Sequence, residues 1–160
     1  MLAPPSVGHC GEPDVDGQRL ACEIARTEQR IPRTIVQTGR EWQHALSSRA
    51  QYMTTWWRLN PEYDYVFYND SRAATFVSEH ASPIELRAYR SLRVGASRTD
   101  LFRLFYLRSF GGVYADLDEE LGRPLSNVVP AGATAVVGDR WPFELLIFEP
   151  WHPIIVGTLG

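Results

Sequence analysis

The chain has 160 residues, of which 44% are hydrophobic and 22% charged, values typical of one globular domain and unlike those of disordered or fibrous proteins. Its net charge of −3 lacks the basic excess of nucleic-acid-binding domains, so we expect no nucleic acid among its partners. All sixteen basic residues are Arg. The absence of Lys excludes reactions that need a lysine, such as Schiff-base formation and phosphate binding by a P-loop.

Residues 1–30 predict an irregular lead-in, rich in Pro and Gly at its start, with at most a short helix over 20–29. We expect residues 31–160 to form the folded core. No apolar run approaches the roughly 20 residues of a membrane-spanning helix, so we expect a soluble chain with no transmembrane segment. Cys10 and Cys22 cannot complete a zinc site by themselves. The sequence leaves open whether they form a disulfide or stay free.

The first part of the core alternates between strand and helix signals. A β-branched run at 34–38 predicts a buried strand, and an alternating aromatic run at 63–68 predicts a second one. Between them, residues 41–59 predict a helix that Asn60–Pro61 ends. The residues available for its core stripe are Trp42, Leu46, Tyr52, Trp56 and Leu59.

The following stretch predicts three helices. The first runs to about His80, with Asp70 or Ser71 as its cap. Ser82-Pro83-Ile84-Glu85 is a capping box that opens a second helix, which runs to about Leu92. The third covers 96–110, and Gly111–Gly112 ends it because glycine adopts the left-handed conformation readily.

Three further strands are predicted at 113–116, 133–137 and 145–148. Strands that alternate with helices indicate an α/β sandwich, so we expect a mainly parallel central sheet flanked by helices.

Two acids stand where the strand at 113–116 leaves the core. Asp116 and Asp118 are two positions apart, a spacing that places both side chains on one side of an extended chain, with backbones about 6–7 Å apart. Glu119 and Glu120 follow, so four acids occupy five positions. Such crowding is unfavourable unless a cation or a basic partner neutralises it. Carboxylate oxygens favour Mg²⁺ or Mn²⁺, with coordination positions left open for a diphosphate.

A bare Asp-x-Asp pair is a weak motif, and Asp14-Val15-Asp16 repeats it in an apparent loop. The position of Asp116 and Asp118 distinguishes them, because they follow an apolar strand and a glycine pair. This is the usual place for ligand contacts in an open α/β sheet.

Asp100 and Arg103 are three positions apart on the preceding helix and so share a face. By spacing alone they form a surface ion pair worth about 0.2–0.5 kcal/mol. Five more arginines crowd this region with Asp100 as the only acid among them, which indicates either a solvated face or a positive lining for a diphosphate. These are Arg87, Arg90, Arg93, Arg98 and Arg108.

The run from Ala96 to Asp118, ASRTDLFRLFYLRSFGGVYADLD, closely resembles the signature of the DXD-motif glycosyltransferases of the family-32 type. These include initiating α-mannosyltransferases and α-galactosyltransferases, with the clostridial glucosylating toxins as distant relatives. Two upstream blocks, at 31–38 and 60–70, are similar to the family's first two strands, in the same order. The resemblance therefore covers about residues 31–118.

The resemblance implies a GT-A fold, Rossmann-like and built to bind a nucleotide-diphosphate sugar. It implies that Asp118 ligates Mn²⁺ or Mg²⁺, and that Asp116 contacts the metal through water, or the ribose. Asp100 and Arg103 would hold the donor sugar and orient its phosphate, and Val36 and Gln37 would border the nucleobase. The activity implied is retaining hexosyl transfer from a UDP- or GDP-sugar to a hydroxyl of a glycan, protein or lipid.

The resemblance also suggests that the family's domain continues past the end of this chain. Eukaryotic relatives act in the Golgi lumen, and bacterial ones act in the cytosol or are delivered into hosts. Two other functions stay open from the sequence: a non-catalytic module that binds metal and sugar nucleotide, and a phosphohydrolase with an aspartyl nucleophile. Glu120 argues against the phosphohydrolase, which prefers Thr or Val at that position.

Overall fold

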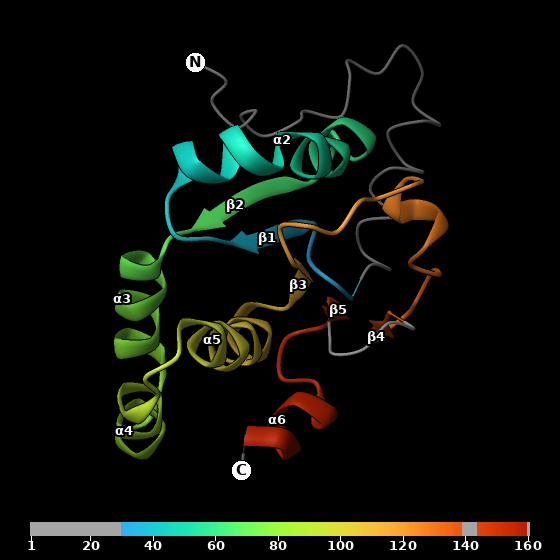
Figure 1. Ribbon diagram of the computed structural model, residues 1–160. Coiled ribbons are helices and arrows are strands. Elements are labelled where there is room, and N and C mark those ends of the chain that lie inside the picture. The colour runs from blue at the N-terminus through green and yellow to red at the C-terminus, as the bar shows by residue number, and fades with distance from the viewer. Residues whose placement is uncertain (1–29, 139–143, 160) are drawn as a thin grey trace.

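The computed structural model describes residues 30–138 and 144–159, which form an α/β sandwich around one five-stranded sheet (Figure 1). The strand order is β2-β1-β3-β5-β4. The strands are β1 (Thr34–Thr38), β2 (Asp64–Tyr68), β3 (Gly112–Ala115), β4 (Ala135–Val137) and β5 (Leu145–Phe148). The helices are α2 (Trp42–Leu59), α3 (Asp70–His80), α4 (Pro83–Ser91), α5 (Gly95–Phe110) and α6 (Pro153–Leu159), with a 3-10 turn η1 (Leu125–Asn127).

The sheet is parallel in its central part. β1 pairs in parallel with both β2 and β3, whereas β5 pairs antiparallel with β3 and with β4. Only β5 therefore runs against the other four strands. The prediction of a mainly parallel sheet is confirmed, and the structure adds one reversed strand beside β3.

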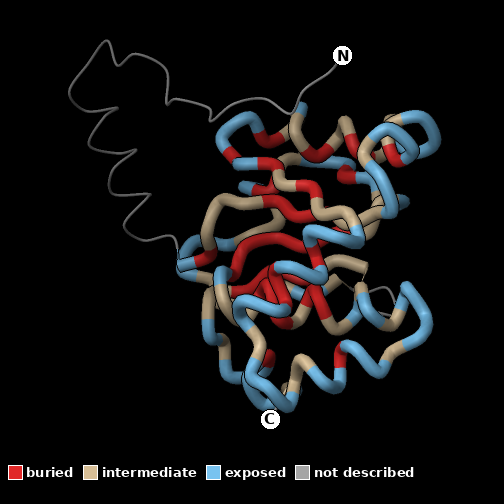
Figure 2. Tube along the Cα trace, turned by 90° about the vertical axis from the view of Figure 1, so that its left-hand side faces the viewer, coloured by how far each residue is buried: buried red, intermediate tan, exposed pale blue. Residues whose placement is uncertain are grey.

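Helices cover both faces of the sheet. In Figure 1, α2 lies on one side of the sheet, and α3, α5 and α6 lie on the other. Successive strand residues contribute to opposite layers, as the pleat requires. Ile35 and Val113 pack with Trp56 of α2, while Val36 and Tyr114 pack with the aromatic side chains of α3 and α5. The three central strands β1, β3 and β5 are consequently buried over most of their length, whereas the edge strands β2 and β4 are not (Figure 2).

Most predicted boundaries agree with the structure to within two residues. The capping box of Ser82 and Glu85 is present, with both reciprocal hydrogen bonds. The predicted cap of α3 was wrong, because Asn69 accepts the hydrogen bond from Arg72 N, and Asp70 is already the first helical residue. Of the predicted stripe on α2, only Trp56 is buried, and Ala45 and Met53 are the other buried positions. The sequence signals did not predict α6.

The glycine pair between α5 and β3 occupies backbone geometry that other residues rarely adopt. Gly111 has φ 64° and Gly112 has φ 100°. A Cβ atom on Gly112 would lie 2.8 Å from Thr34 O of β1, and one on Gly111 would lie 2.7 Å from Phe148 O of β5. The pair lets β3 insert between its two neighbours immediately after α5 ends.

Several predictions concern residues 1–29, including the lead-in, its short helix, Cys10, Cys22 and the Asp14-Val15-Asp16 motif. These lie outside the described residues. Within the part that the structure describes, no helix combines the length and the apolarity needed to cross a bilayer.

Candidate functional site

The chain leaves the sheet at Asp116 and turns at once. Asp116 N donates to Glu144 O at 2.9 Å, which extends the pairing of β3 with the β5 side by one residue. Glu119 N then donates to Asp116 O at 3.1 Å, closing a turn over Leu117 and Asp118. The prediction that Asp116 and Asp118 lie on one side of an extended strand was therefore wrong. Tertiary contacts of the following loop bend the backbone there.

Asp116 is held in place by two neighbours. Its Oδ1 accepts a hydrogen bond from Tyr114 Oη at 2.8 Å and lies 3.4 Å from Arg103 Nη2. Partial burial raises the pKa of the Asp116 carboxyl, and Arg103 and Tyr114 oppose that rise. Both contacts go to Oδ1, so the other carboxylate oxygen remains available to a ligand.

Arg103 is the buried side chain that connects Asp100 to Asp116. Its side chain is only 7% exposed, and its Nη2 lies 2.6 Å from Asp100 Oδ1. Its guanidinium also lies over the Tyr114 ring, 4.6 Å from the centroid. A surface ion pair, the simplest interpretation of the i, i+3 spacing, does not describe this arrangement. Arg103 is a fixed positive charge directly behind Asp116, while Asp100 is largely exposed.

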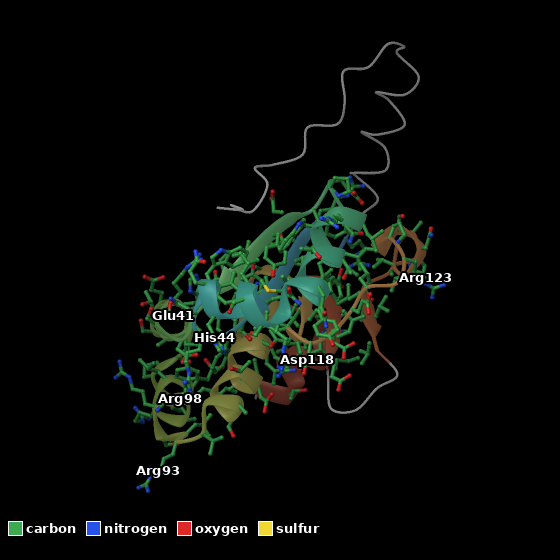
Figure 3. The ribbon with its side chains drawn as sticks, turned by 45° about the horizontal axis from the view of Figure 1, so that its top comes forward. Glu41, His44, Arg93, Arg98, Asp118 and Arg123 are labelled. Atoms are coloured by element: carbon green, nitrogen blue, oxygen red, sulfur yellow. The ribbon has the colours of Figure 1, made fainter. Side chains whose placement is uncertain are left out.

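Asp118 differs from Asp116 because it is exposed. The Asp118 side chain is labelled in Figure 3. It lines a cavity of about 470 Å³ together with Tyr52 of α2 and Glu144. Three of the four acids that follow β3 line this cavity. The full lining is Tyr52, Asp118, Glu119, Glu120, Gly138, Glu144 and Leu145.

The loop after Asp118 is anchored to the C-terminal half of α2. Trp56 Nε1 donates to Glu119 O at 2.8 Å, and Leu121 N donates to Thr55 Oγ1 at 3.0 Å. Asn60 is fully buried at the end of α2, where its Oδ1 accepts from Leu125 N at 2.7 Å. Buried polar groups of this kind fix one backbone path because leaving them unpaired is costly. The helix therefore positions the acidic turn.

Val36 and Gln37, the residues predicted to border a nucleobase, are both fully buried in β1. Gln37 Nε2 donates to Asp116 O at 2.9 Å, and its Oε1 accepts from Tyr65 Oη at 2.5 Å. In this structure Gln37 supports the backbone of Asp116 and presents no side chain to a ligand. Their contact with a base stays a prediction.

The other arginines of the crowded region do not converge on Asp116. Arg108 forms an ion pair with Glu85 of α4. Arg98 Nε donates to Leu92 O at 2.8 Å. Arg87, Arg90 and Arg93 are exposed. Of the six, only Arg103 lies within ion-pair distance of the acidic turn in the described residues.

With this geometry in place, comparison with known proteins identifies the chain. Residues 47–135 match the family described as "Glycosyltransferase sugar-binding region containing DXD motif". This match covers more than half of the 160 residues and includes Asp100, Arg103, Asp116 and Asp118. The chain belongs to this family. The prediction made from the resemblance is confirmed.

Curated relatives include two yeast enzymes. The chain is 33% identical over 103 residues to a mannosyl phosphorylinositol ceramide synthase of Saccharomyces cerevisiae, covering 63% of this chain and 27% of that protein. It is 36% identical over 100 residues to inositol phosphoceramide mannosyltransferase 3 of Schizosaccharomyces pombe, covering 61% of this chain and 28% of that protein. The matched region thus spans about a quarter of these relatives.

A solved structure shows the same fold. PaToxG glycosyltransferase superposes with a TM-score of 0.57 at 14% sequence identity, covering 89% of this chain and 66% of that chain. This structural similarity and the sheet order β2-β1-β3-β5-β4 together confirm the predicted GT-A fold.

For the family's metal, the two aspartates offer a suitable but small donor set. The described residues contain no group of three or more His, Cys, Asp or Glu side chains placed to hold an ion. Two carboxylates leave most coordination positions of a hard divalent cation for diphosphate oxygens and water. The residues present therefore fit a cation that is shared between protein and substrate.

Three residues of the site escaped the sequence analysis. Tyr114 holds Asp116, and its hydroxyl also lies 3.0 Å from Thr38 Oγ1. Glu144 lines the cavity, and its Oε2 is buried without a hydrogen-bond partner among the described residues. Gly39 leaves room for Leu117, whose Cδ1 would lie 2.6 Å from an added Cβ. Glu144 and Gly39 reach the site through tertiary packing, and Tyr114 is joined both to Asp116, two positions away, and to the distant Thr38, so no local pattern marks these roles.

The three described histidines, His44, His80 and His152, lie outside the cavity beside Asp118. His80 stacks on Phe76 at 4.3 Å, and its Nδ1 lies 2.9 Å from Phe76 O. His152 Nδ1 accepts from Ile154 N at 3.3 Å at the start of α6. His44 is exposed on α2 (Figure 3).

Proposed function

We propose that this chain is a metal-dependent glycosyltransferase that moves a sugar from a nucleotide-diphosphate donor to a hydroxyl acceptor. The observation that carries the proposal is the contrast within the Asp-x-Asp pair. Asp116 is clamped by Tyr114 and Arg103, while Asp118 is exposed on a turn beside a cavity of about 470 Å³. One carboxylate held in place and one exposed carboxylate, both at the end of a central strand, suit a divalent cation that is bound jointly by the protein and the diphosphate of the donor.

Each residue of the site would have a separate role in binding the donor and the metal. Asp118 would ligate the cation, and Asp116 would contact either the cation through water or the ribose. A bound Mn²⁺ or Mg²⁺ stabilises the negative charge that develops on the leaving diphosphate. Arg103 adds a preorganised positive charge, since its side chain is buried and its fork is fixed by Asp100 and the Tyr114 ring. Asp100, being exposed, is placed to accept hydrogen bonds from the donor sugar.

The finer properties of the reaction rest on the family. Retention of the anomeric configuration, a hexosyl donor and a preference for manganese are implied by the resemblance of residues 96–118. Two relatives are named for joining mannose and inositol phosphoceramide. A mannosyl donor and a hydroxyl-bearing lipid are therefore the first donor and acceptor that we propose to test.

The decisive experiment is calorimetry of the chain with UDP- and GDP-sugars, each with and without Mn²⁺. We expect the D118A variant to lose metal-dependent donor binding, by about 100-fold or more, while its circular dichroism and unfolding midpoint stay those of the wild type. Asp118 is exposed, so its removal leaves no buried group unpaired. The matched control is E62A: Glu62 is exposed just before β2, at the opposite edge of the sheet from Asp118, because β2 and β3 run in the same direction. Equal binding by D118A and wild type would refute the assignment.

Turnover separates an enzyme from a binding module. Donor, Mn²⁺ and acceptor should release free nucleoside diphosphate, and the D118A variant should not. Tight, metal-dependent donor binding without any such release would favour the non-catalytic module.

A further inference from the structure

The helix α4 presents a basic face that has no part in the proposed donor site. Arg87, Arg90 and Arg93 are all exposed, and among the described residues none of them forms an ion pair. Residues 86–99 hold four Arg and no Asp or Glu, although the whole chain carries a net charge of −3. The positive charge is therefore concentrated at one end of a protein that is acidic elsewhere.

Two aliphatic side chains flank these arginines. Ile84 is 71% exposed at the start of α4, and Val94 is 61% exposed just beyond its end. Ile84, Arg87 and Arg90 are three positions apart along the helix, which places them on neighbouring parts of one side. Tyr89 is the buried residue of α4 and faces the protein. We call Ile84, Arg87, Arg90, Arg93 and Val94 the α4 basic face.

The α4 basic face is also free of nearby neutralising acids on its own helix. Glu85 is the only acid on α4, and it is engaged by Arg108 and by Ser82 N. On the helices packed around it, Asp100 pairs with Arg103, and Asp70 lines a small cavity with Arg98. Asp70 and Glu79 are both exposed on α3, and neither forms an ion pair among the described residues. The three arginines thus outnumber the acids that could cancel their field.

The face lies at a corner of the molecule. In Figure 1, α4 is at the lower end, away from the sheet and from α2. In Figure 3, the Arg93 side chain extends away from the protein, and Arg123 lies at the opposite end. A flat surface can therefore reach the α4 basic face without contact with the cavity beside Asp118, which none of its five residues lines.

We propose that the α4 basic face docks the protein on an anionic lipid surface. Arginines attract anionic headgroups, and exposed aliphatic side chains such as Ile84 and Val94 insert at the boundary between the headgroups and the acyl chains. Single-stranded nucleic acid fits less well, because the face has no exposed aromatic ring for base stacking. This docking does not depend on the proposed function, since it uses neither Asp116 nor Asp118.

Co-sedimentation of the 160-residue chain with vesicles tests the proposal. We expect binding to phosphatidylcholine vesicles that contain phosphatidylserine, little binding to phosphatidylcholine alone, and weaker binding at high salt because screening shortens the reach of the charges. The R87E/R90E/R93E variant should bind at least about tenfold less tightly. The I84S/V94S variant should also bind less tightly, although its charge is unchanged.

The matched control is R49E/R58E/R123E, which reverses three exposed arginines elsewhere on the surface. It has the same net charge as the α4 triple variant, and its vesicle binding should stay close to that of the wild type. All changed residues are exposed, and circular dichroism checks that each variant is folded. Equal binding of the wild type to neutral and anionic vesicles would overturn the proposal. So would equal losses in the two triple variants, or binding to DNA without binding to vesicles.

Discussion

The two ends of β3 are constrained in opposite ways. At its N-terminal end, Gly111 and Gly112 approach the backbones of β5 and β1 so closely that neither position has room for a Cβ. At its C-terminal end, side-chain contacts impose the constraint. Tyr114 and Arg103 hold Asp116, and the following turn leaves Asp118 exposed. The N-terminal end of β3 is thus fixed by backbone packing and carries no candidate catalytic residue. The C-terminal end carries the candidate catalytic residues, and polar contacts from other elements determine its conformation.

The first prediction concerns the N-terminal end of β3. The G112A variant should lose about 3 kcal/mol or more of unfolding free energy, because alanine is strained at φ 100° and its Cβ would meet Thr34 O at 2.8 Å. Urea denaturation measures this loss. Gly122 has no atom within 4 Å of an added Cβ and no positive φ, so G122A is the control and should change stability by less than about 0.5 kcal/mol. Equal stability of G112A and wild type would show that β1 yields at this position.

The second prediction concerns the loop that follows the C-terminal end of β3. The N60A variant removes the buried acceptor of Leu125 N and the donor to Trp56 O, so we expect a loss of about 2 kcal/mol. Donor binding should weaken as well, since the loop from Glu119 to Leu125 would lose an anchor at its far end. Urea denaturation and calorimetry with the donor give the two numbers. N127A changes an exposed asparagine of η1 and should leave both unchanged.

The third prediction concerns the ion pair between α4 and α5, the helix that precedes β3. Arg108 hydrogen bonds to Glu85 and thereby lowers the pKa of that carboxyl below its ordinary value of 4.5. A lowered folded-state pKa contributes stability that is complete above pH 4.5 and is lost as pH falls through the lowered value. The E85Q variant should therefore be less stable at neutral pH, by about 1 kcal/mol, and should lose less stability on acidification.

Unfolding by urea at several pH values between neutral and acid measures this difference. Glutamine can still accept the hydrogen bond from Ser82 N, so the substitution tests the charge and spares the cap. E79Q, at an exposed acid of α3, should follow the wild-type pH profile. Parallel profiles for E85Q and wild type would contradict a contribution from this ion pair.

The sequence determined most of the local structure. The boundaries of the strands and of α2 to α5 follow from hydrophobic period, capping residues and the glycine pair, because these signals act within a few residues of one another. The position of Asp116 and Asp118 at the end of a strand was also readable, since it depends only on chain order. The short helix α6, which has no acidic first turn or basic last turn, was not readable from such signals.

Only the tertiary structure decided how the site is built. The turn at Leu117 and Asp118, the burial of Gln37, the placement of Arg103 behind Asp116 and the arrival of Glu144 at the cavity all depend on contacts between residues distant in sequence. A period or a spacing describes which face a residue shares with its near neighbours. It does not say which strand or helix will be packed against that face, and here the packing determines which acid is clamped and which is exposed.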